Sequence, residues 1–237
     1  MTQPPIIALA STKGGVGKTT LAFCLATELA RRLVGKPNNR HADILGHRNT
    51  DTPVYCLDAD PNQTLSAVVR RGKPEGVTVE PANGETILER LGEALKRGRI
   101  ILIDLEGTAN QAMLYACGKA DLVLIPAQPS QFDVVEALKT HAVVAQASDL
   151  SRRTILSRVV LSRTPVLHQR VAAHSRRQFV ERELPTLRCE MLERAVFRQM
   201  TYTGKPPFAE NPASSASENV AALVDEVLSL LKGRADG

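Results

Sequence analysis

The sequence predicts an α/β fold, a doubly wound and mostly parallel sheet with helices on both faces. Two observations lead to this prediction. Short apolar runs alternate along the chain with longer segments of helical periodicity, which is typical of β-α-β units. The chain also has 237 residues, enough for one sizeable core, so we expect residues 1–237 to form a single domain.

The first half of the chain supplies three predicted strands and three predicted helices. The apolar runs IIALA, VYCLD and IILID predict strands over residues 6–10, 54–58 and 100–104. Helical periodicity predicts helices over residues 18–33, 64–71 and 84–98, the first with leucines four residues apart. The polar, turn-rich segment 35–53 interrupts the alternation and is predicted to be an exposed insertion.

The second half continues the same alternation. The runs DLVLIP and TILSRVVLS predict strands over residues 121–126 and 154–162, and periodicity predicts helices over residues 131–147, 168–184 and 214–232. The last helix has a clear apolar stripe, and Ser215 with Glu218 suits a capping box at its start. Residues 233–237 are predicted to be a flexible tail.

Composition disfavours several classes of site. Only 3% of the residues are aromatic and none is Trp, so few side chains could stack on single-stranded nucleic acid. The 4 cysteines are scattered without a CxxC pair, which disfavours disulfides and zinc sites. The N-terminus lacks the basic region of a signal peptide, and no run of about 18 apolar residues is present. We therefore expect a cytoplasmic protein.

A glycine-rich turn, STKGGVGKTT at residues 11–20, connects the first predicted strand to the first predicted helix. Backbone N–H groups at such a helix start bind phosphate, and glycines allow its close approach. Lys18 is placed to reach the β- and γ-phosphates, and the Thr19 hydroxyl to bind Mg²⁺. The strict P-loop pattern, G-x-x-x-x-G-K-[ST], has glycine at the position that Thr12 occupies here. The residues predicted to bind ATP are Lys13, Gly14, Gly15, Val16, Gly17, Lys18, Thr19 and Thr20.

The loop carries an additional lysine, Lys13, ahead of its glycines, and this lysine makes KGGVGKTT a deviant Walker A motif. By this motif the chain resembles the ParA/MinD family of P-loop ATPases. The resemblance covers most of the chain except residues 35–53. It implies a slow, partner-stimulated ATP hydrolase that uses ATP and Mg²⁺ and forms a homodimer on ATP. In that family the early lysine reaches the other subunit's phosphates, so Lys13 and Lys18 are both expected to act in catalysis.

Three aspartates follow predicted strands, at the sheet edge where doubly wound folds bind ligands. VYCLDADPNQT resembles the family's DxDPQ segment, although Asn62 is inserted after the proline. By this resemblance, Asp58 lies near Mg²⁺, and Asp60 orients or activates the attacking water. IILID resembles a Walker B strand, whose Asp104 is expected to hold Mg²⁺.

The two residues Glu106 and Gly107 fall where the family's second switch loop begins. Gly107 is expected to supply a hinge that responds to the γ-phosphate. The segment here, LEGTAN, lacks the prolines that partition ATPases often carry after the Walker B aspartate.

Residues 151–205 carry a local excess of positive charge. Twelve Lys or Arg and four acidic residues give this segment a net charge of +8, whereas the whole chain has +5. Eleven of the twelve are Arg, whose fork binds phosphate, so we expect sequence-independent binding to the backbone of double-stranded DNA. The residues predicted to contact DNA are Arg170, Arg176, Arg177 and Arg198.

Two cellular tasks fit this chemistry, and the first is the preferred prediction. One is ParA-type segregation of plasmid or chromosomal DNA on the nucleoid, with a ParB-like partner. The other is VirC1-like accessory ATPase activity in conjugative transfer, with a relaxase partner, because LERAVFRQM is similar to VirC1-like members.

Three further classes are less favoured. A MinD-like positioning ATPase would bind membrane, but the acidic residues of the last helix oppose stable association with anionic lipid. A metabolic enzyme such as dethiobiotin synthetase is disfavoured by Asp60 and the basic segment. A nitrogenase-iron-protein-like reductase is rejected because Cys117 has no second cluster cysteine.

Overall fold

A parallel sheet of seven strands forms the centre of the computed structural model, which describes residues 3–34, 52–108, 110–166 and 169–235. The strands lie in the order β3-β2-β4-β1-β5-β6-β7, and neighbouring strands pair in parallel. In chain order they are β1 (Ile6–Leu9), β2 (Thr52–Ala59), β3 (Val77–Pro81), β4 (Gly98–Leu105), β5 (Leu122–Ala127), β6 (Leu156–Thr164) and β7 (Met191–Leu192). The predicted fold class is therefore confirmed.

The helices include all those predicted from periodicity. They are α1 (Lys18–Leu33), α3 (Thr64–Gly72), α4 (Ile87–Arg97), α5 (Gln111–Lys119), α6 (Gln131–Ser151), α7 (Gln169–Glu181), α8 (Ala195–Thr203), α9 (Pro207–Glu210) and α10 (Ser215–Ala235). Helices α5, α8 and α9 and strands β3 and β7 have no counterpart among the elements predicted from apolar runs and periodicity. The predicted capping box is wrong by one residue, because Ser214 Oγ accepts a hydrogen bond from the Ser217 N–H (3.2 Å).

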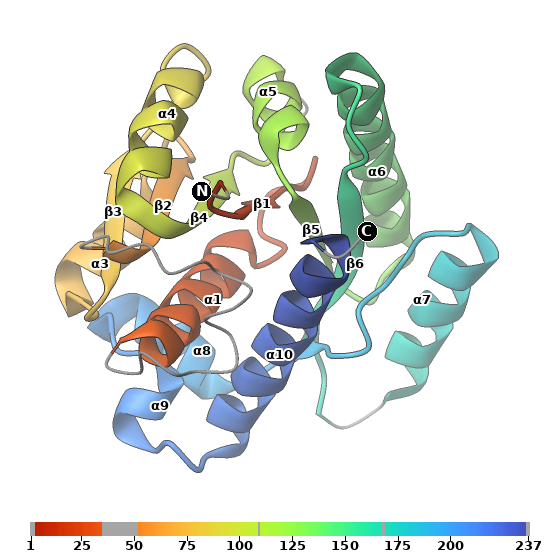
Figure 1. The fold of residues 1–237 in the computed structure, drawn as a ribbon. Helices are drawn as coiled ribbons and strands as arrows, with labels where there is room; N and C mark the ends of the chain where they lie inside the picture. Colours follow the sequence, from red (N-terminus) through yellow and green to blue (C-terminus); the bar gives the residue numbers. More distant parts are fainter. Residues whose placement is uncertain (1–2, 35–51, 109, 167–168, 236–237) are drawn as a thin grey trace.

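Alternate side chains of each central strand enter two separate apolar cores. Ile7 and Leu9 pack with α1, α3, α8 and α10, whereas Ile6 and Ala8 pack with α4, α5 and α6. Figure 1 shows these helices on opposite sides of the sheet, with α1 and α10 on one side and α4 and α5 on the other. Burial on both faces explains why these strands are continuous apolar runs in the sequence.

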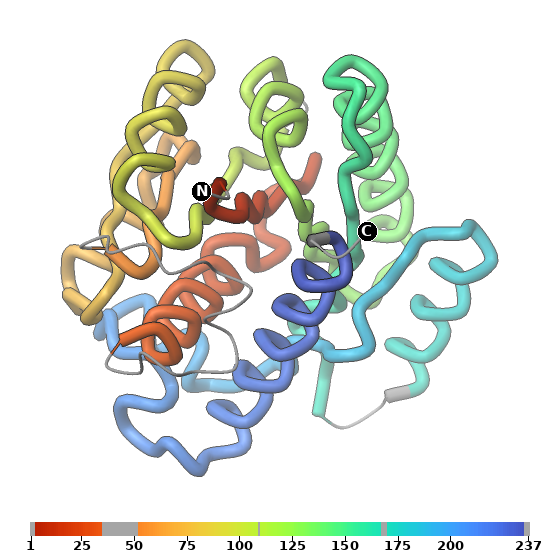
Figure 2. Tube along the Cα trace, in the orientation of Figure 1, coloured from red at the N-terminus to blue at the C-terminus, as the bar shows by residue number. Residues whose placement is uncertain are grey.

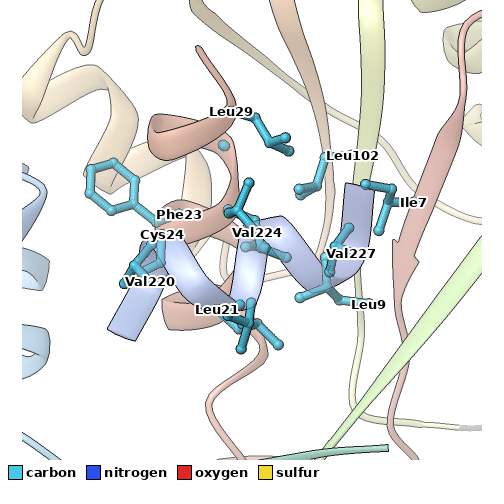
Figure 3. Packing of buried hydrophobic residues seen from close by; sticks show 14 of the residues in the cluster. Ile7, Leu9, Leu21, Phe23, Cys24, Leu29, Leu102, Val220, Val224 and Val227 are labelled. Carbon is cyan, nitrogen blue, oxygen red and sulfur yellow. The ribbon is translucent and has the colours of Figure 1, made fainter. Parts of the chain in front are cut away.

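The first and last helices lie side by side although they come from opposite ends of the chain (red and blue in Figure 2). Figure 3 shows Val224 and Val227 of α10 close to Leu21 of α1 and Leu9 of β1. All four side chains are buried. Helix α10 thus covers both α1 and the central strand.

The predicted tail is partly helical. Residues 233–235 continue α10, and Arg234 forms an ion pair with Asp121, which precedes β5. The other carboxylate oxygen of Asp121 accepts a hydrogen bond from the Ile6 N–H (2.8 Å). The end of α10 is therefore tied to the beginning of the central strand.

The predicted insertion 35–53 lies outside the described residues, except that Thr52 and Pro53 begin β2. Residues 236–237 of the predicted tail also lie outside them. None of the described helices combines the length and the apolar run that a membrane crossing needs.

Candidate functional site

The carboxyl ends of β1, β2 and β4 bring the glycine-rich loop and the three predicted aspartates to one edge of the sheet. Asp104 is the register partner of Asp58 across β2 and β4, and of Leu9 across β1 and β4. The loop leaves β1 at this edge and enters α1 at Lys18. Since β1 pairs with both β4 and β5, the loop occupies the middle of the edge.

The backbone of the loop is suited to an anion. Gly15 (φ +76°) and Gly17 (φ +94°) adopt left-handed conformations that glycine allows at little cost. Gly17 caps α1 without any side-chain hydrogen bond, so N–H groups of the first turn are available to a ligand. Two side chains support the loop: Ser162 donates to the Val16 carbonyl (2.6 Å), and Gln128 to the Gly15 carbonyl (3.2 Å).

Thr12 occupies the position where the strict motif has glycine, and it anchors the loop to α6. Its N–H donates to Thr140 Oγ1 (3.0 Å), and its hydroxyl donates to Glu136 Oε2 (2.7 Å). Glycine would supply the first bond but not the second. The departure from the strict motif therefore adds a side-chain attachment between the loop and this helix.

The two loop lysines have different acidic neighbours. Lys13 Nζ forms an ion pair with Asp133 Oδ2 on α6 (2.8 Å), whereas Lys18 Nζ donates to the Lys13 carbonyl (3.3 Å). Burial lowers the pKa of Lys18, and the carboxylates of Asp104 and Asp60 act in the opposite direction. Lys13 is thus paired with a carboxylate, whereas Lys18 only lies near carboxylates whose charge favours its ammonium form.

Asp104 is buried without a compensating contact. Its side chain is fully enclosed, and neither carboxylate oxygen has a hydrogen-bond partner among the described residues. Burial raises the pKa of Asp104 to about 7, while the nearby Thr19 hydroxyl lowers it without completing a hydrogen bond. Burial of an ionised carboxylate without a partner costs free energy, so we expect a cation to bind beside Asp104.

Asp104 and Thr19 offer the oxygen ligands that Mg²⁺ prefers. No group of three His, Cys, Asp or Glu side chains in the described part of the chain could hold a metal ion. The two oxygen donors of Asp104 and Thr19 fit Mg²⁺, which usually takes one or two protein oxygens and completes its shell with water and substrate phosphates. A metal at this site would therefore arrive together with a phosphate ligand.

Asp58 and Asp60 are held by the turn that follows β2. Asp58 is buried, which raises its pKa, and its oxygens accept from the N–H groups of Ser66 (2.7 Å) and Asp60 (3.3 Å). Asp60 is half-buried, and its Oδ1 accepts from the Asn62 N–H (2.8 Å). The inserted Asn62 therefore helps to orient the Asp60 carboxylate.

The two residues predicted as a switch lie against the loop. A Cβ on Gly107 would be 3.0 Å from the Gly14 nitrogen and 3.1 Å from its Cα, so the two backbones are in direct contact. The Glu106 carboxylate accepts from the Asn110 side-chain amide (3.0 Å), and Asn110 caps α5. The segment after β4 thus connects the loop to α5.

A pocket of about 340 Å³ opens beside the end of the loop, at the lower end of the size range of small-molecule sites. Its lining includes Gly17, Thr20, Arg163, Phe197, Arg198 and Tyr202. The pocket therefore combines aromatic rings with guanidinium groups next to the first turn of α1.

The four arginines predicted to contact DNA have three different environments. Arg170 and Arg177 are exposed on α7 and, being seven residues apart, lie on one face of that helix. Arg176 instead pairs with Glu190 (2.7 Å) and also donates to a backbone carbonyl. Arg198 lines the pocket beside the loop.

Sequence reasoning missed Asp133, Gln128 and Ser162. The start of α6 carries an available signal, because Ser130 and Asp133 have the S-x-x-D spacing of a capping box, and Ser130 Oγ accepts from the Asp133 N–H (3.1 Å). Gln128 follows β5 and Ser162 lies near the end of β6. Their position at the carboxyl edge is the same signal that located the aspartates.

Comparison with known proteins identifies the family. Residues 84–224 match the family model described as VirC1 protein. The protein ParA from Rhizobium radiobacter is 27% identical over 226 residues, which cover 93% of this chain and 91% of that protein.

Two solved structures share the fold at low sequence identity. Apo McdA from Cyanothece covers 94% of this chain and 99% of its own, with a TM-score of 0.72 and 19% identity. The cell division ATPase MinD from Pyrococcus furiosus covers 95% and 99%, with a TM-score of 0.68 and 18% identity. From the family match and the ParA relative, we conclude that the chain belongs to the VirC1 family, within the ParA/MinD-type ATPases.

Proposed function

We propose that this chain is an ATP-driven switch that binds ATP and Mg²⁺ at the loop of residues 11–20, pairs with a second copy and hydrolyses ATP. Turnover is slow until a partner protein stimulates it. The observation that carries the proposal is the buried, unpartnered Asp104 beside Thr19 and Lys18. A phosphate-bound cation is the ligand that would satisfy these three groups together.

Each residue of the site has a role in this proposal. The N–H groups of residues 14–19 and the Lys18 ammonium bind the β- and γ-phosphates. Bound Mg²⁺ supplies positive charge to the phosphate oxygens, and Thr19 and Asp104 hold it. Asp58 orients this edge through its backbone hydrogen bonds. Asp60 positions the attacking water and accepts its proton.

The second copy completes the site through Lys13. As the γ-phosphoryl leaves, negative charge develops on its oxygens, and a lysine from the other subunit stabilises that charge. The pocket lined by Thr20, Phe197 and Arg198 takes the base, because it continues from the phosphate-binding loop and offers an aromatic ring. Gly107, in contact with Gly14, responds to the γ-phosphate.

The proposed object of the switch is double-stranded DNA. Arg170 and Arg177 on α7 are exposed and belong to the basic segment 151–205, so they are suited to phosphate contacts without base recognition. Similarity to the protein ParA supports DNA segregation with a ParB-like partner. The match of residues 84–224 to the VirC1 model supports the second candidate, an accessory role in conjugative transfer with a relaxase partner.

Titration calorimetry with ATP and Mg²⁺ tests the nucleotide site. We expect Lys18→Ala to lose at least about tenfold in affinity, because charged hydrogen bonds to phosphate contribute about 1.5–3 kcal/mol each. The exposed Lys96→Ala is the matched control. Absence of ATP binding by the unaltered chain would overturn the proposal.

Sedimentation with ATP tests the role of the second copy. Lys13→Ala should bind ATP as a monomer without pairing or turning over. Asp60→Ala should pair and then remain paired, because its water is no longer activated. Normal turnover of Lys13→Ala, or an Asp60→Ala variant that stays monomeric with ATP, would count against the assigned roles.

A mobility-shift titration with random-sequence DNA tests the basic face. Reversal of Arg170 and Arg177 to Glu should weaken binding and reduce the slope of log affinity against log salt by about two, one for each lost phosphate contact. Reversal of Arg70 and Lys119, which are exposed outside the basic segment, is the matched control. An equal effect of both reversals would indicate net charge rather than a DNA-binding face. Co-purification with a ParB-like protein or with a relaxase then separates the two tasks.

A further inference from the structure

The ion pair between Lys13 and Asp133 holds a loop lysine within its own subunit. Lys13 Nζ lies 2.8 Å from Asp133 Oδ2, although the two residues come from different elements, the loop after β1 and the first turn of α6. The Lys13 side chain is 37% exposed, whereas that of Asp133 is only 3% exposed. The cation can therefore reach solvent while its partner stays in place.

Asp133 has hydrogen-bond donors other than Lys13. The Ser130 hydroxyl donates to Asp133 Oδ2, and the Gln128 N–H donates to Oδ1 (3.2 Å). The carboxylate also lies in the first turn of α6, where the helix dipole favours negative charge. If Lys13 leaves, these contacts still satisfy the buried carboxylate, so the ion pair can open at low cost.

The backbone around Lys13 is held by hydrogen bonds that do not involve its side chain. The preceding Thr12 is bonded to Glu136 and Thr140 of the same helix, and the Lys13 N–H donates to Ser11 Oγ (3.2 Å). The ammonium group can thus exchange one acceptor for another without movement of the loop. Its two acceptors are Asp133 within the subunit and, in the proposed function, the phosphate held by the second copy.

We infer that Asp133 is a latch that holds Lys13 in the single chain and competes with ATP-dependent pairing of two copies. The inference rests on the proposed function, because only pairing gives Lys13 a second acceptor. A partly exposed ion pair shifts an equilibrium by about two- to fivefold. Two latches open for each pair of copies, so loss of both should tighten pairing by about four- to 25-fold.

Asp133→Asn removes the charge of the latch. Its single side-chain oxygen can still accept from the Gln128 N–H, and its amide N–H can donate to Ser130 Oγ, which becomes the acceptor. Asp149→Asn is the matched control, because Asp149 is an exposed acid near the other end of α6. Sedimentation with a non-hydrolysable ATP analogue measures pairing. ATP affinity and thermal unfolding of each variant show whether the loop and the fold are intact.

A second measurement detects the latch without any pairing. In the nucleotide-free chain, the rate at which an amine-reactive acetylating reagent modifies Lys13 is followed by peptide mass spectrometry. We expect faster modification of Lys13 in Asp133→Asn than in the unaltered chain. Lys139 is the internal reference, because its own ion pair with Glu136 (2.8 Å) is retained in the variant.

The expected result is tighter pairing and faster Lys13 modification in Asp133→Asn, and neither change in Asp149→Asn. Unchanged modification of Lys13 would overturn the latch while leaving the proposed function intact. Weaker pairing by a folded Asp133→Asn variant with normal ATP affinity would mean that Asp133 orients Lys13 for the second copy, which also overturns the latch. An unaltered chain that binds ATP but never pairs would overturn the proposed dimer and the competition with it, whatever the modification rates.

Discussion

Replacement of Asp104 by Asn should stabilise the nucleotide-free protein while it removes a ligand for magnesium. The carboxyl group is buried with no hydrogen-bond partner among the described residues. Burial raises its pKa from the ordinary 3.8 to about 7, so ionisation inside the folded chain is disfavoured by about 4 kcal/mol at 1.36 kcal/mol per pKa unit. The asparagine side chain is neutral and avoids this cost.

The Asp104 carboxyl lowers the free energy of unfolding more at high pH than at low pH. Below pH 3.8 the carboxyl is protonated in both the folded and the unfolded chain and has no effect on their balance. As the pH rises toward 7, the unfolded chain ionises first, so the free energy of unfolding falls, and above pH 7 the loss is complete. Between pH 5 and pH 8 the advantage of Asp104→Asn should therefore grow by about 2–3 kcal/mol.

Urea unfolding at pH 5 and pH 8, with EDTA and no nucleotide, measures this difference. Comparison between the two pH values cancels the constant cost of burying an unpaired amide, which is about 1–3 kcal/mol. Asp149→Asn, which replaces an exposed acid, should show no such growth. With Mg²⁺ and ATP present the order should reverse, because only the unaltered chain gains stability from the full ligand set. If Asp104→Asn changes the free energy of unfolding by the same amount at both pH values, burial does not raise the pKa of Asp104 and the reasoning is refuted.

Three further substitutions test the loop and the helices around it. Gly107→Ala should lower ATP affinity by about tenfold or more in calorimetry, because its Cβ would lie 3.0 Å from the Gly14 backbone and the loop would have to shift. Thr12→Gly brings the chain closer to the strict motif but removes the hydroxyl bonded to Glu136, so we expect ATP affinity to fall by about fivefold rather than rise, with Thr12→Ser near normal. Gly92→Ala, in the interior of α4 with no atom within 4 Å of the new Cβ, should raise the free energy of unfolding by about 0.5–1 kcal/mol in urea titration, and a loss of stability would show that the site is not open.

The sequence predicted best those elements whose burial leaves a local pattern. The central strands are buried on both faces and are therefore continuous apolar runs, and α1 was predicted with its observed bounds because leucines repeat along it. Strand β3 escaped because it is half-buried at the edge of the sheet and ends at Pro81. Helix α5 escaped because its sequence, QAMLYACGK, is apolar at six consecutive positions and therefore shows no alternation between an apolar and a polar face.

In the candidate site, too, the sequence predicted the residues that form a local pattern and missed those that are brought in from distant segments. The motif around Lys18 is contiguous, so its residues could be named before the structure was known. The partners of the loop are distant in the chain: Asp133 is 120 residues from Lys13, and Ser162 is 146 residues from Val16. A pattern in one segment indicates that a side chain is placed at an edge or a helix start, but not which loop atom it contacts. Those pairings depend on the order of the strands.

The position of α10 has a consequence for synthesis of the chain. The face of the central strand that carries Leu9 is covered by Val224 and Val227, which a ribosome adds long after it has made Leu9. Until they emerge, the nascent chain exposes an apolar surface at its middle, a condition that favours aggregation or chaperone capture. A chain that stops before α10 should therefore be insoluble, even though it contains every residue of the glycine-rich loop.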